Sequence, residues 1–144
     1  MKKKIAILGS TGSIGKSTLD IIRRDKKNFE TVFLSANNNY KKLIQQAKEF
    51  NVKNVLIKNK IFYERVKKAL KKKKTKVFSG DTSINNIISG KLDYTMSAVV
   101  GLAGLQPTID AIKISKTVAI ANKESIVCGW NILSKFIKKY KTEV

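Results

Sequence analysis

Short apolar runs alternate with amphipathic segments from one end of the chain to the other. The apolar runs predict β-strands over Lys4–Leu8, Thr31–Ser35, Asn54–Ile57, Lys76–Ser79, Tyr94–Val100 and Thr117–Ala121. The segments between them place apolar residues on one helical face and predict helices over Ser17–Arg24, Tyr40–Phe50, Ile61–Lys73, Leu105–Ile114 and Glu124–Tyr140. A further short helix is expected around Ile84, Ile87 and Ile88, with Asp81 as its N-cap and Gly90 as its stop.

The expected strands are continuous apolar runs, not runs in which apolar and polar residues alternate. Strands of this kind are buried on both faces, as in a parallel sheet covered by helices. The alternation of strand and helix therefore predicts a Rossmann-like, doubly wound α/β fold with a mostly parallel sheet. No internal repeat or linker divides residues 1–144, so we expect one domain. Residues 141–144 resemble the approach to another strand, where we expect a second domain to begin.

Composition excludes several kinds of chemistry. The 144 residues include no histidine and a single cysteine, so His-based catalysis, His-ligated zinc and a disulfide framework are excluded. Cys128 is expected to be a buried helix residue with no catalytic role. No apolar run approaches the roughly 20 residues of a membrane span, and the run after Met1 is too short for a signal peptide. We therefore expect an intracellular protein without a membrane partner.

The chain carries a formal charge of +20, from 30 basic and 10 acidic residues. Such an excess suggests nucleic-acid binding. Only Arg23, Arg24 and Arg65 are arginine, however, and arginine is the residue that dominates base recognition. We interpret the charge as compositional bias on a solvated surface and expect no nucleic-acid partner. The run Lys71–Lys74 is expected at a helix C-terminus, where cations suit the helix dipole. A nucleic-acid binder is an alternative that rests on charge alone.

The strongest local motif is the glycine-rich loop Gly9–Gly15, which has the spacing G-x-x-G-x-x-G. It follows the first expected strand and opens the first expected helix, the setting in which such loops bind dinucleotides. Glycines let the backbone approach a pyrophosphate, and the free N–H groups of the helix N-terminus bind its oxygens. Thr11 and Ser13 add hydroxyl donors. The loop thus predicts dinucleotide phosphate binding.

A P-loop is the competing interpretation of the same residues. The segment Ser10–Ser17 matches G-x-x-x-x-G-K-[ST] except at its first position, which is Ser10 and not glycine. Gly9 lies one residue too early, and no acidic strand with a long apolar lead-in follows. A nucleotide triphosphatase is therefore the less favoured alternative.

The end of the second expected strand distinguishes between cofactors. NAD-binding domains usually place an acid about 20 residues beyond the glycine loop, where it accepts from the ribose 2′-OH. Here the chain has Asn37, Asn38 and Asn39, followed by Lys41 and Lys42. Asparagine amides can donate to a 2′-phosphate and no acid repels it, so NADP is favoured over NAD. An asparagine-rich turn without a ligand is the alternative.

A second loop of interest, Ala121–Ser125, follows the last expected strand and opens the last expected helix. Parallel strands end at one edge of their sheet, where ligands bind. Asn122 can donate to and accept from a cofactor, and Lys123 suits an anionic or hydroxylated substrate. Glu124 suits a helix N-terminus by charge, so simple capping explains it equally well. The small residues of Ser97–Gly104 form a similar turn at the same edge.

Several segments together resemble one enzyme family. They are Gly9–Gly15, Ser17–Asp20, Val99–Leu105, Pro107-Thr108 and Ala121–Ser125, in this order and spacing. The set resembles the N-terminal domain of 1-deoxy-D-xylulose 5-phosphate reductoisomerase over essentially the whole chain. The resemblance implies an NADPH-dependent oxidoreductase of non-mevalonate isoprenoid biosynthesis, the MEP pathway. Enzymes of this family rearrange the phosphosugar 1-deoxy-D-xylulose 5-phosphate on Mg²⁺ or Mn²⁺. They then reduce the aldehyde with NADPH to 2-C-methyl-D-erythritol 4-phosphate.

The resemblance also implies roles for individual residues. The positions that match the phosphate-binding loop are Thr11, Gly12, Ser13 and Ile14. Those that match the ribose-phosphate contacts are Asn37, Asn38 and Asn39, and those that match further cofactor contacts are Asn122 and Glu124. Lys123 matches a substrate contact. Many members have glycine and a basic residue where this chain has Asn37 and Asn38, which leaves the mode of 2′-phosphate recognition open.

The remaining parts of the family's site are expected outside these residues. Family members continue into an Asp-Ser-Glu segment that holds the metal, a lid and a C-terminal helical domain. No residue of this chain is expected to be catalytic or to ligate the metal, and the chain alone is expected to bind NADPH without turnover. The complete enzyme is expected to be a homodimer in the bacterial cytoplasm or in a plastid-like organelle. A stand-alone NADP-binding module and another NADPH-dependent reductase are the alternatives.

Overall fold

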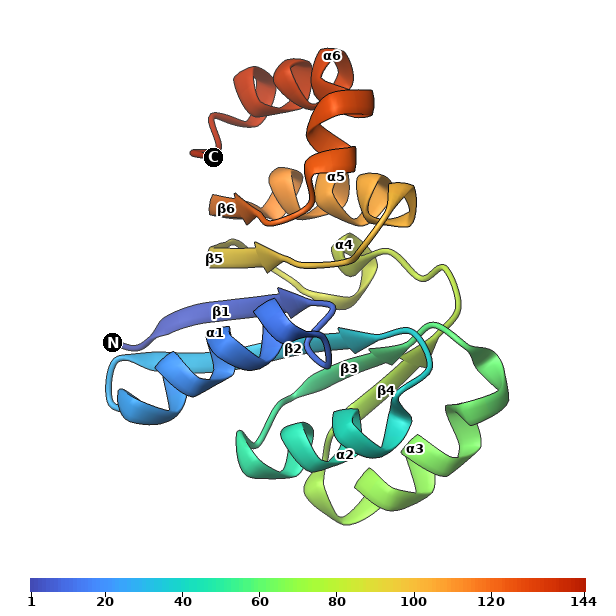
Figure 1. Ribbon diagram of the computed structural model, residues 1–144. Coiled ribbons are helices and arrows are strands. Elements are labelled where there is room, and N and C mark those ends of the chain that lie inside the picture. Colours follow the sequence, from blue (N-terminus) through green and yellow to red (C-terminus); the bar gives the residue numbers. More distant parts are fainter.

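All named strands lie parallel in a single six-stranded sheet of the computed structural model, which describes residues 1–144 (Figure 1). The strands are β1 Lys3–Leu8, β2 Phe29–Ala36, β3 Asn54–Ile57, β4 Lys76–Ser79, β5 Leu92–Ser97 and β6 Ser115–Ile120. Their order across the sheet is β4-β3-β2-β1-β5-β6. The chain therefore builds one half of the sheet outward from β1 and the other half outward from β5, which confirms the doubly wound prediction.

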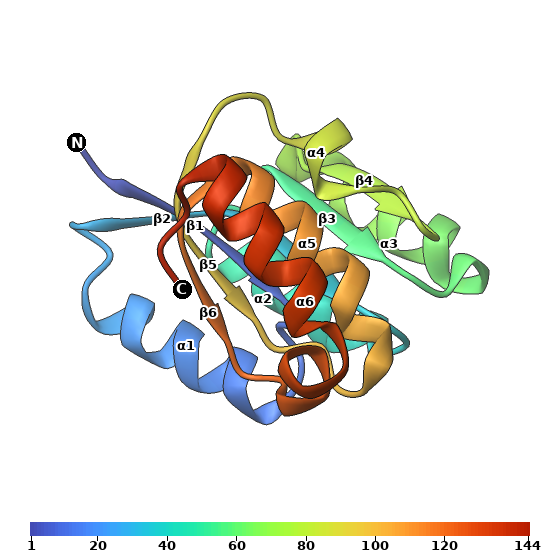
Figure 2. The same cartoon turned by 90° about the horizontal axis from the view of Figure 1, so that it is seen from above.

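Helices connect the strands and cover both faces of the sheet. They are α1 Ser13–Arg24, α2 Tyr40–Glu49, α3 Tyr63–Leu70, α4 Ile84–Ile87, α5 Leu105–Ile114 and α6 Lys123–Tyr140. Short 3₁₀ turns adjoin α3 and α5, namely η1 Lys60–Phe62, η2 Lys71–Lys73 and η3 Leu102–Gly104. Figure 1 shows α1, α2 and α3 in front of the sheet and α5 behind it, and Figure 2 shows α6 lying over α5.

Each face of the sheet has its own apolar core. Ile5 and Ile7 of β1 pack with the helices α1, α2 and α3, whereas Ala6 and Leu8 pack with α4, α5 and α6. Consecutive side chains of a strand point to opposite faces, so a continuous apolar run fills both cores at once. The two-sided burial predicted from the sequence is therefore confirmed in β1.

Several element boundaries differ from the prediction. The helix α1 begins at Ser13, four residues before the predicted Ser17, because its glycine-rich first turn has no apolar periodicity to reveal it. The strand β5 ends at Ser97, although the apolar run continues to Val100, because the chain turns there toward η3 with Gly101 at φ +73°. The predicted helix 61–73 is divided into η1, α3 and η2.

Two predictions about single residues are wrong. The N-cap of α4 is Ser83, whose hydroxyl accepts from Asn85 N at 3.2 Å, whereas Asp81 is exposed and faces Lys58 at 3.4 Å. Cys128, predicted to be buried, is exposed. The buried positions of α6 include Ser125 and Gly129, and Cys128 falls outside that face.

The residues after α6 return to the sheet. Glu143 forms an isolated parallel bridge with Thr117 of β6, with backbone bonds of 2.8 Å from Val118 N to Glu143 O and from Glu143 N to Lys116 O. This agrees with the strand-like character that the sequence predicted for residues 141–144.

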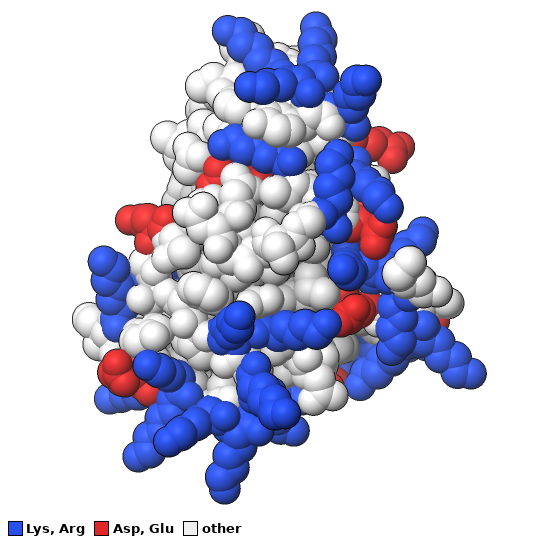
Figure 3. Space-filling model, turned by 180° about the vertical axis from the view of Figure 1, so that it is seen from behind, with Lys and Arg blue, Asp and Glu red and all other residues white.

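Charge is distributed over the surface and not gathered in one stripe. Figure 3 shows lysine and arginine side chains from the α6 end of the molecule to the α3 end, with acidic side chains among them. The run Lys71–Lys73 forms η2 directly after α3, as predicted, and Lys74 closes it in the left-handed region at φ 57°. None of the helices combines the length and the apolar character that crossing a membrane requires.

Candidate functional site

The loops that follow β1, β2, β5 and β6 leave the sheet at the same edge, because the strands are parallel (Figure 1). Backbone hydrogen bonds tie these loops to the ends of neighbouring strands: Ser10 N donates to Ser35 O of β2 at 2.8 Å, and Ala98 N donates to Leu8 O of β1 at 2.9 Å. The strand order reverses between β1 and β5, so the β1–α1 loop lies at the point where doubly wound sheets form their ligand-binding crevice.

Glycine is required at two positions of the β1–α1 loop. Gly9 has φ +78°, and a Cβ atom there would stand 2.6 Å from the Ala98 carbonyl oxygen of the loop after β5. A Cβ atom at Gly15 would stand 2.5 Å from Ser10 Cα. The loop is therefore packed against β5 on one side and against the first turn of α1 on the other.

The first turn of α1 presents unpaired backbone donors. Its N-cap is Gly12, which has no side chain to accept from the turn, and Lys16 N is the first amide to find a partner along the helix, at 2.9 Å from Gly12 O. Helix geometry leaves the N–H groups of Ser13, Ile14 and Gly15 without an intrahelical acceptor. The first turn contains no acidic residue. An anion is the acceptor that fits this arrangement.

A buried polar network holds the loop from behind. Gln46 of α2, which is 3% exposed, donates from its Nε2 to Ser10 O at 2.9 Å and accepts from Ser10 Oγ at 2.8 Å. The Ser35 hydroxyl in turn accepts from Gly9 N at 3.2 Å. These contacts fix the loop backbone to the second strand and the second helix. They also explain Ser10, because this buried serine makes contacts that a P-loop glycine could not.

Sequence reasoning did not identify Gln46 or Ser35. The signal in the sequence was a glutamine on the apolar face of an amphipathic segment, between Leu43 and Ala47. A polar residue at such a position is buried only where it finds partners.

The asparagine loop Asn37–Asn39 is exposed and lies between β2 and α2. Asn39 is the N-cap of α2, and its side chain accepts from Lys42 N at 3.2 Å. Asn38 Oδ1 accepts from Asn59 Nδ2 at 2.9 Å, and Asn37 O accepts from Asn59 N at 3.0 Å. The predicted turn is therefore present, with Asn39 occupied as a cap and the NH₂ group of Asn38 left free. A role of these asparagines as donors to a 2′-phosphate stays a prediction.

Asn122 organises the loop between β6 and α6. Its Nδ2 donates to Val99 O at 2.5 Å and to Gly101 O at 2.6 Å, and its Oδ1 accepts from Ser125 N at 3.3 Å. The residue is 4% exposed, so its side chain ties the loops after β5 and β6 together. Its direct contact with a cofactor stays a prediction.

Lys123 and Glu124 follow at the start of α6. Lys123 is exposed and Glu124 is half-buried. Glu124 lies in the first turn, where the helix dipole favours a carboxylate. Their roles toward substrate and cofactor stay predictions.

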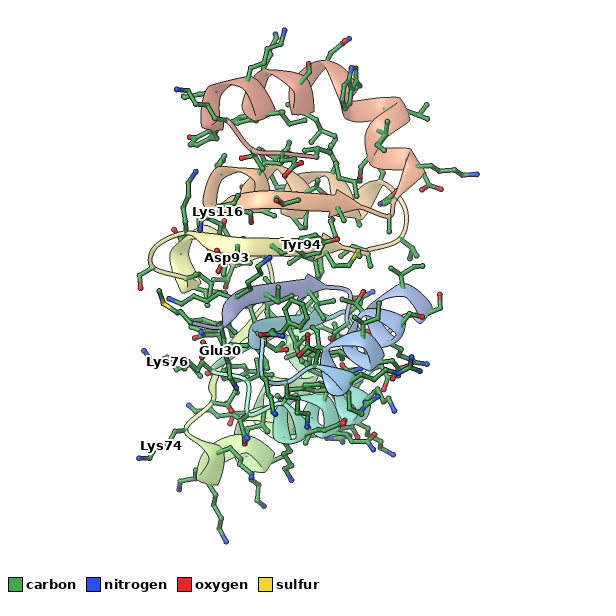
Figure 4. The ribbon with its side chains drawn as sticks, turned by 90° about the vertical axis from the view of Figure 1, so that its left-hand side faces the viewer. Glu30, Lys74, Lys76, Asp93, Tyr94 and Lys116 are labelled. Atoms are coloured by element: carbon green, nitrogen blue, oxygen red, sulfur yellow. The ribbon has the colours of Figure 1, made fainter.

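The groups with displaced pKa values belong to other parts of the molecule. Donation from Lys116 Nζ at 2.7 Å and from Lys4 N at 2.9 Å lowers the pKa of Asp93, near the start of β5 (Figure 4). A hydrogen bond from Arg23 lowers the pKa of Glu49, and burial raises the pKa of the Tyr94 hydroxyl. None of these groups lies in the loops at the carboxyl edge of the sheet. What those loops offer for binding is amide, hydroxyl and lysine donors.

The fold and the β1–α1 loop define a Rossmann-type α/β domain. The sequence model of the 1-deoxy-D-xylulose 5-phosphate reductoisomerase family matches residues 5–129. The chain belongs to this family. That membership decides against the triphosphatase interpretation.

Individual members of the family resemble the chain closely. The 1-deoxy-D-xylulose 5-phosphate reductoisomerase of Pelagibacter ubique (strain HTCC1062) is 56% identical over 142 residues, which cover 97% of the chain and 37% of that relative. The enzyme of Bacteroides fragilis (strain YCH46) is 40% identical over 144 residues, covering 99% of the chain and 37% of the relative. The chain thus spans a little over a third of the length of these curated relatives.

Solved structures of the family have the same fold. The reductoisomerase from Zymomonas mobilis in complex with NADPH superposes with a TM-score of 0.93 at 36% identity, over 99% of the chain and 38% of that structure. A DOX-P reductoisomerase in complex with NADPH, fosmidomycin and magnesium superposes with a TM-score of 0.89 at 32% identity, over 97% of the chain and 35% of that structure.

Proposed function

We propose that the chain is the NADPH-binding part of a 1-deoxy-D-xylulose 5-phosphate reductoisomerase. The observation that carries the proposal is the β1–α1 loop, which presents the free amides of Ser13, Ile14 and Gly15 at the switch point of the sheet. The likeness to an NADPH complex of the family, with a TM-score of 0.93, supports the choice of ligand. The complete enzyme would convert 1-deoxy-D-xylulose 5-phosphate to 2-C-methyl-D-erythritol 4-phosphate in the MEP pathway.

The residues of the loops suit distinct parts of the cofactor. In this proposal Thr11, Gly12, Ser13 and Ile14 bind the pyrophosphate, since the amides of Ser13 and Ile14 open α1 without an intrahelical acceptor and Thr11 and Ser13 add hydroxyl donors. The asparagines Asn37, Asn38 and Asn39 receive the ribose 2′-phosphate. Asn122 shapes the crevice and contacts the cofactor together with Glu124, and Lys123 faces the phosphosugar. NADPH supplies a hydride when bound, and the chain's own residues hold and orient it.

The metal and the remaining chemistry are assigned to other parts of the complete enzyme. No group of three or more His, Cys, Asp or Glu residues comes together in residues 1–144, so the residues present do not fit Mg²⁺ or Mn²⁺. We infer that the chain alone binds NADPH without turnover. We also propose that the complete enzyme is a homodimer. A bacterial cytoplasmic location is favoured over a plastid-like organelle by the bacterial relatives.

A thermal-shift titration with NADPH, NADH and Mg·ATP tests the proposal. A ligand at 100 times its Kd that binds only the native state stabilises it by about 2.7 kcal/mol, which raises the midpoint of a domain this size by roughly 10 °C. We expect NADPH to produce the largest shift. A shift with Mg·ATP alone, or with none of the three ligands, contradicts the proposal.

Gly12→Asp is a variant designed to abolish NADPH binding in this titration while leaving the fold intact. Gly12 is exposed with φ −77°, and a Cβ atom there has no neighbour closer than 3.7 Å, so an aspartate fits and caps α1. Its charge repels a pyrophosphate at the same place. We expect the variant to melt no lower than the wild type and to lose the NADPH shift.

A further inference from the structure

The asparagine loop Asn37–Asn39 contains no cation, but the loop beside it contains two. The strands β2 and β3 pair in parallel up to Ala36 and Ile57. Beyond that pair the chain continues as Lys58, Asn59 and Lys60, a segment that we call the β3 loop. Backbone bonds hold the two loops together, from Lys58 N to Ala36 O at 2.9 Å and from Asn59 N to Asn37 O at 3.0 Å.

The amide of Asn59 is fixed at both ends. Its Oδ1 accepts from Ile61 N at 3.1 Å and caps the turn η1, and its Nδ2 donates to Asn38 Oδ1 at 2.9 Å. Because the Ile61 N–H can only donate, the oxygen of Asn59 must face it, and the NH₂ group of Asn59 must face Asn38. Asn38 therefore turns its carbonyl oxygen inward, and its NH₂ group has no acceptor within the chain.

The side chains of the two lysines of the β3 loop lie against residues that follow β4. The Nζ atom of Lys58 lies 3.4 Å from Asp81 Oδ1, and both side chains are largely exposed, so this pair is weak. The side chain of Lys60 passes over Gly80, with its Cε atom 2.5 Å from the place of a Cβ atom there. Asp81 is the acidic residue that the structure places against Lys58.

We propose that Asn59 sets the preference for a 2′-phosphorylated cofactor, by holding the Asn38 side chain with its NH₂ group free to donate a hydrogen bond. The proposal rests on the proposed binding of NADPH. A 2′-phosphate needs donors, whereas the 2′-OH of NADH needs an acceptor, and the acceptor oxygen of Asn38 is already engaged by Asn59. Asn59 is a positioning residue, since it acts through Asn38.

The test is the ratio of the dissociation constants for NADH and NADPH in Asn59→Asp. One carboxylate oxygen still caps Ile61 N, but the other opposes Asn38 Oδ1, so the Asn38 amide rotates and points its oxygen outward. We expect the preference for NADPH to fall about tenfold or more, the size of one charge-assisted hydrogen bond. NADH binding should change much less. Titration of cofactor fluorescence with the whole chain measures both constants.

Matched variants separate this role from general effects. Asn131→Asp makes the same charge change on the exposed surface of α6 and should leave the ratio unchanged. Asn59→Ser retains a capping oxygen for Ile61 N but cannot reach Asn38, and it should lower the preference by about threefold, as for a lost neutral hydrogen bond.

The outcomes distinguish a failure of the proposed NADPH binding from a failure of the proposed role of Asn59. If the wild type binds neither cofactor, the proposed function fails and this inference fails with it. A second outcome is that the wild type prefers NADPH, but Asn59→Asp and Asn59→Ser have the same ratio of NADH to NADPH dissociation constants as Asn131→Asp. The proposed function then stands and the role of Asn59 is refuted. A parallel loss of both cofactors in Asn59→Asp also refutes it, because a merely structural role predicts that result.

Discussion

At the scale of single residues, the glycine loop depends on polar atoms that lie behind it. Ser10 and Gln46 are both buried, and each satisfies the other through two hydrogen bonds. The loop residues were predicted from the sequence because glycine spacing is a local signal. Gln46 was not, because helical periodicity treats every glutamine as an exposed position, and only the folded structure supplies its partner 36 residues away.

Gln46→Met tests this support. The substitution keeps the length of the side chain but leaves the buried Ser10 carbonyl without a partner and the Ser10 hydroxyl with only its 3.3 Å bond to Ser35 O. We expect the free energy of unfolding to fall by about 2–3 kcal/mol, the cost of such unsatisfied groups, and NADPH binding to weaken because the loop is no longer fixed. Urea unfolding measures the first effect. Gln45→Met, at the exposed neighbouring position, should change stability by less than about 0.5 kcal/mol, and an equal loss in both variants would contradict the role of Gln46.

At the scale of elements, most strands and helices follow from apolar patterns, while their ends depend on contacts that the pattern does not contain. The run that includes β5 is apolar to Val100, yet the strand stops at Ser97 because Asn122 binds the carbonyls of Val99 and Gly101. From its place in the loop, the sequence predicted that Asn122 contacts a ligand. It could not show that the side chain also joins two connections and caps α6.

Asn122→Ala measures how much this joining contributes. Loss of the cap of α6 costs about 1 kcal/mol. Leaving the Val99 carbonyl without its donor costs about 1 kcal/mol or more in addition, while Gly101 O keeps its bond from Gly104 N at 3.2 Å. Asn39→Ala removes only a cap, at the start of α2, and is the reference. We expect chemical denaturation to show Asn122→Ala as the more destabilised of the two. Equal losses would mean that Asn122 serves as a cap alone.

At the scale of the whole molecule, the alternation of buried strands and amphipathic helices was sufficient to predict the doubly wound class. The order of the strands was not predicted, because it depends on which helix covers which face. That order places β1 between β2 and β5, where Asp93 joins β1 and β6 through Lys4 and Lys116. In a chain of net charge +20, each carboxylate placed among cations also reduces the repulsion between them.

The pH dependence of stability reports on this carboxylate. The hydrogen bonds from Lys116 and Lys4 lower the pKa of Asp93 from its ordinary value of 3.8 in the folded chain. A group whose pKa is lowered by folding stabilises the native state above its unfolded value, and this contribution is lost as the pH falls through the folded value. The difference in unfolding free energy between the wild type and Asp93→Asn should therefore be constant above about pH 5 and shrink below about pH 4.

Glu64→Gln removes the same charge from an exposed side chain without a hydrogen bond and controls for net charge. If the difference in unfolding free energy between the wild type and Asp93→Asn stays constant down to the acid transition, the ion pair at the amino ends of β5 and β6 contributes nothing to folding. The repulsion among the 30 basic side chains is then balanced by other groups.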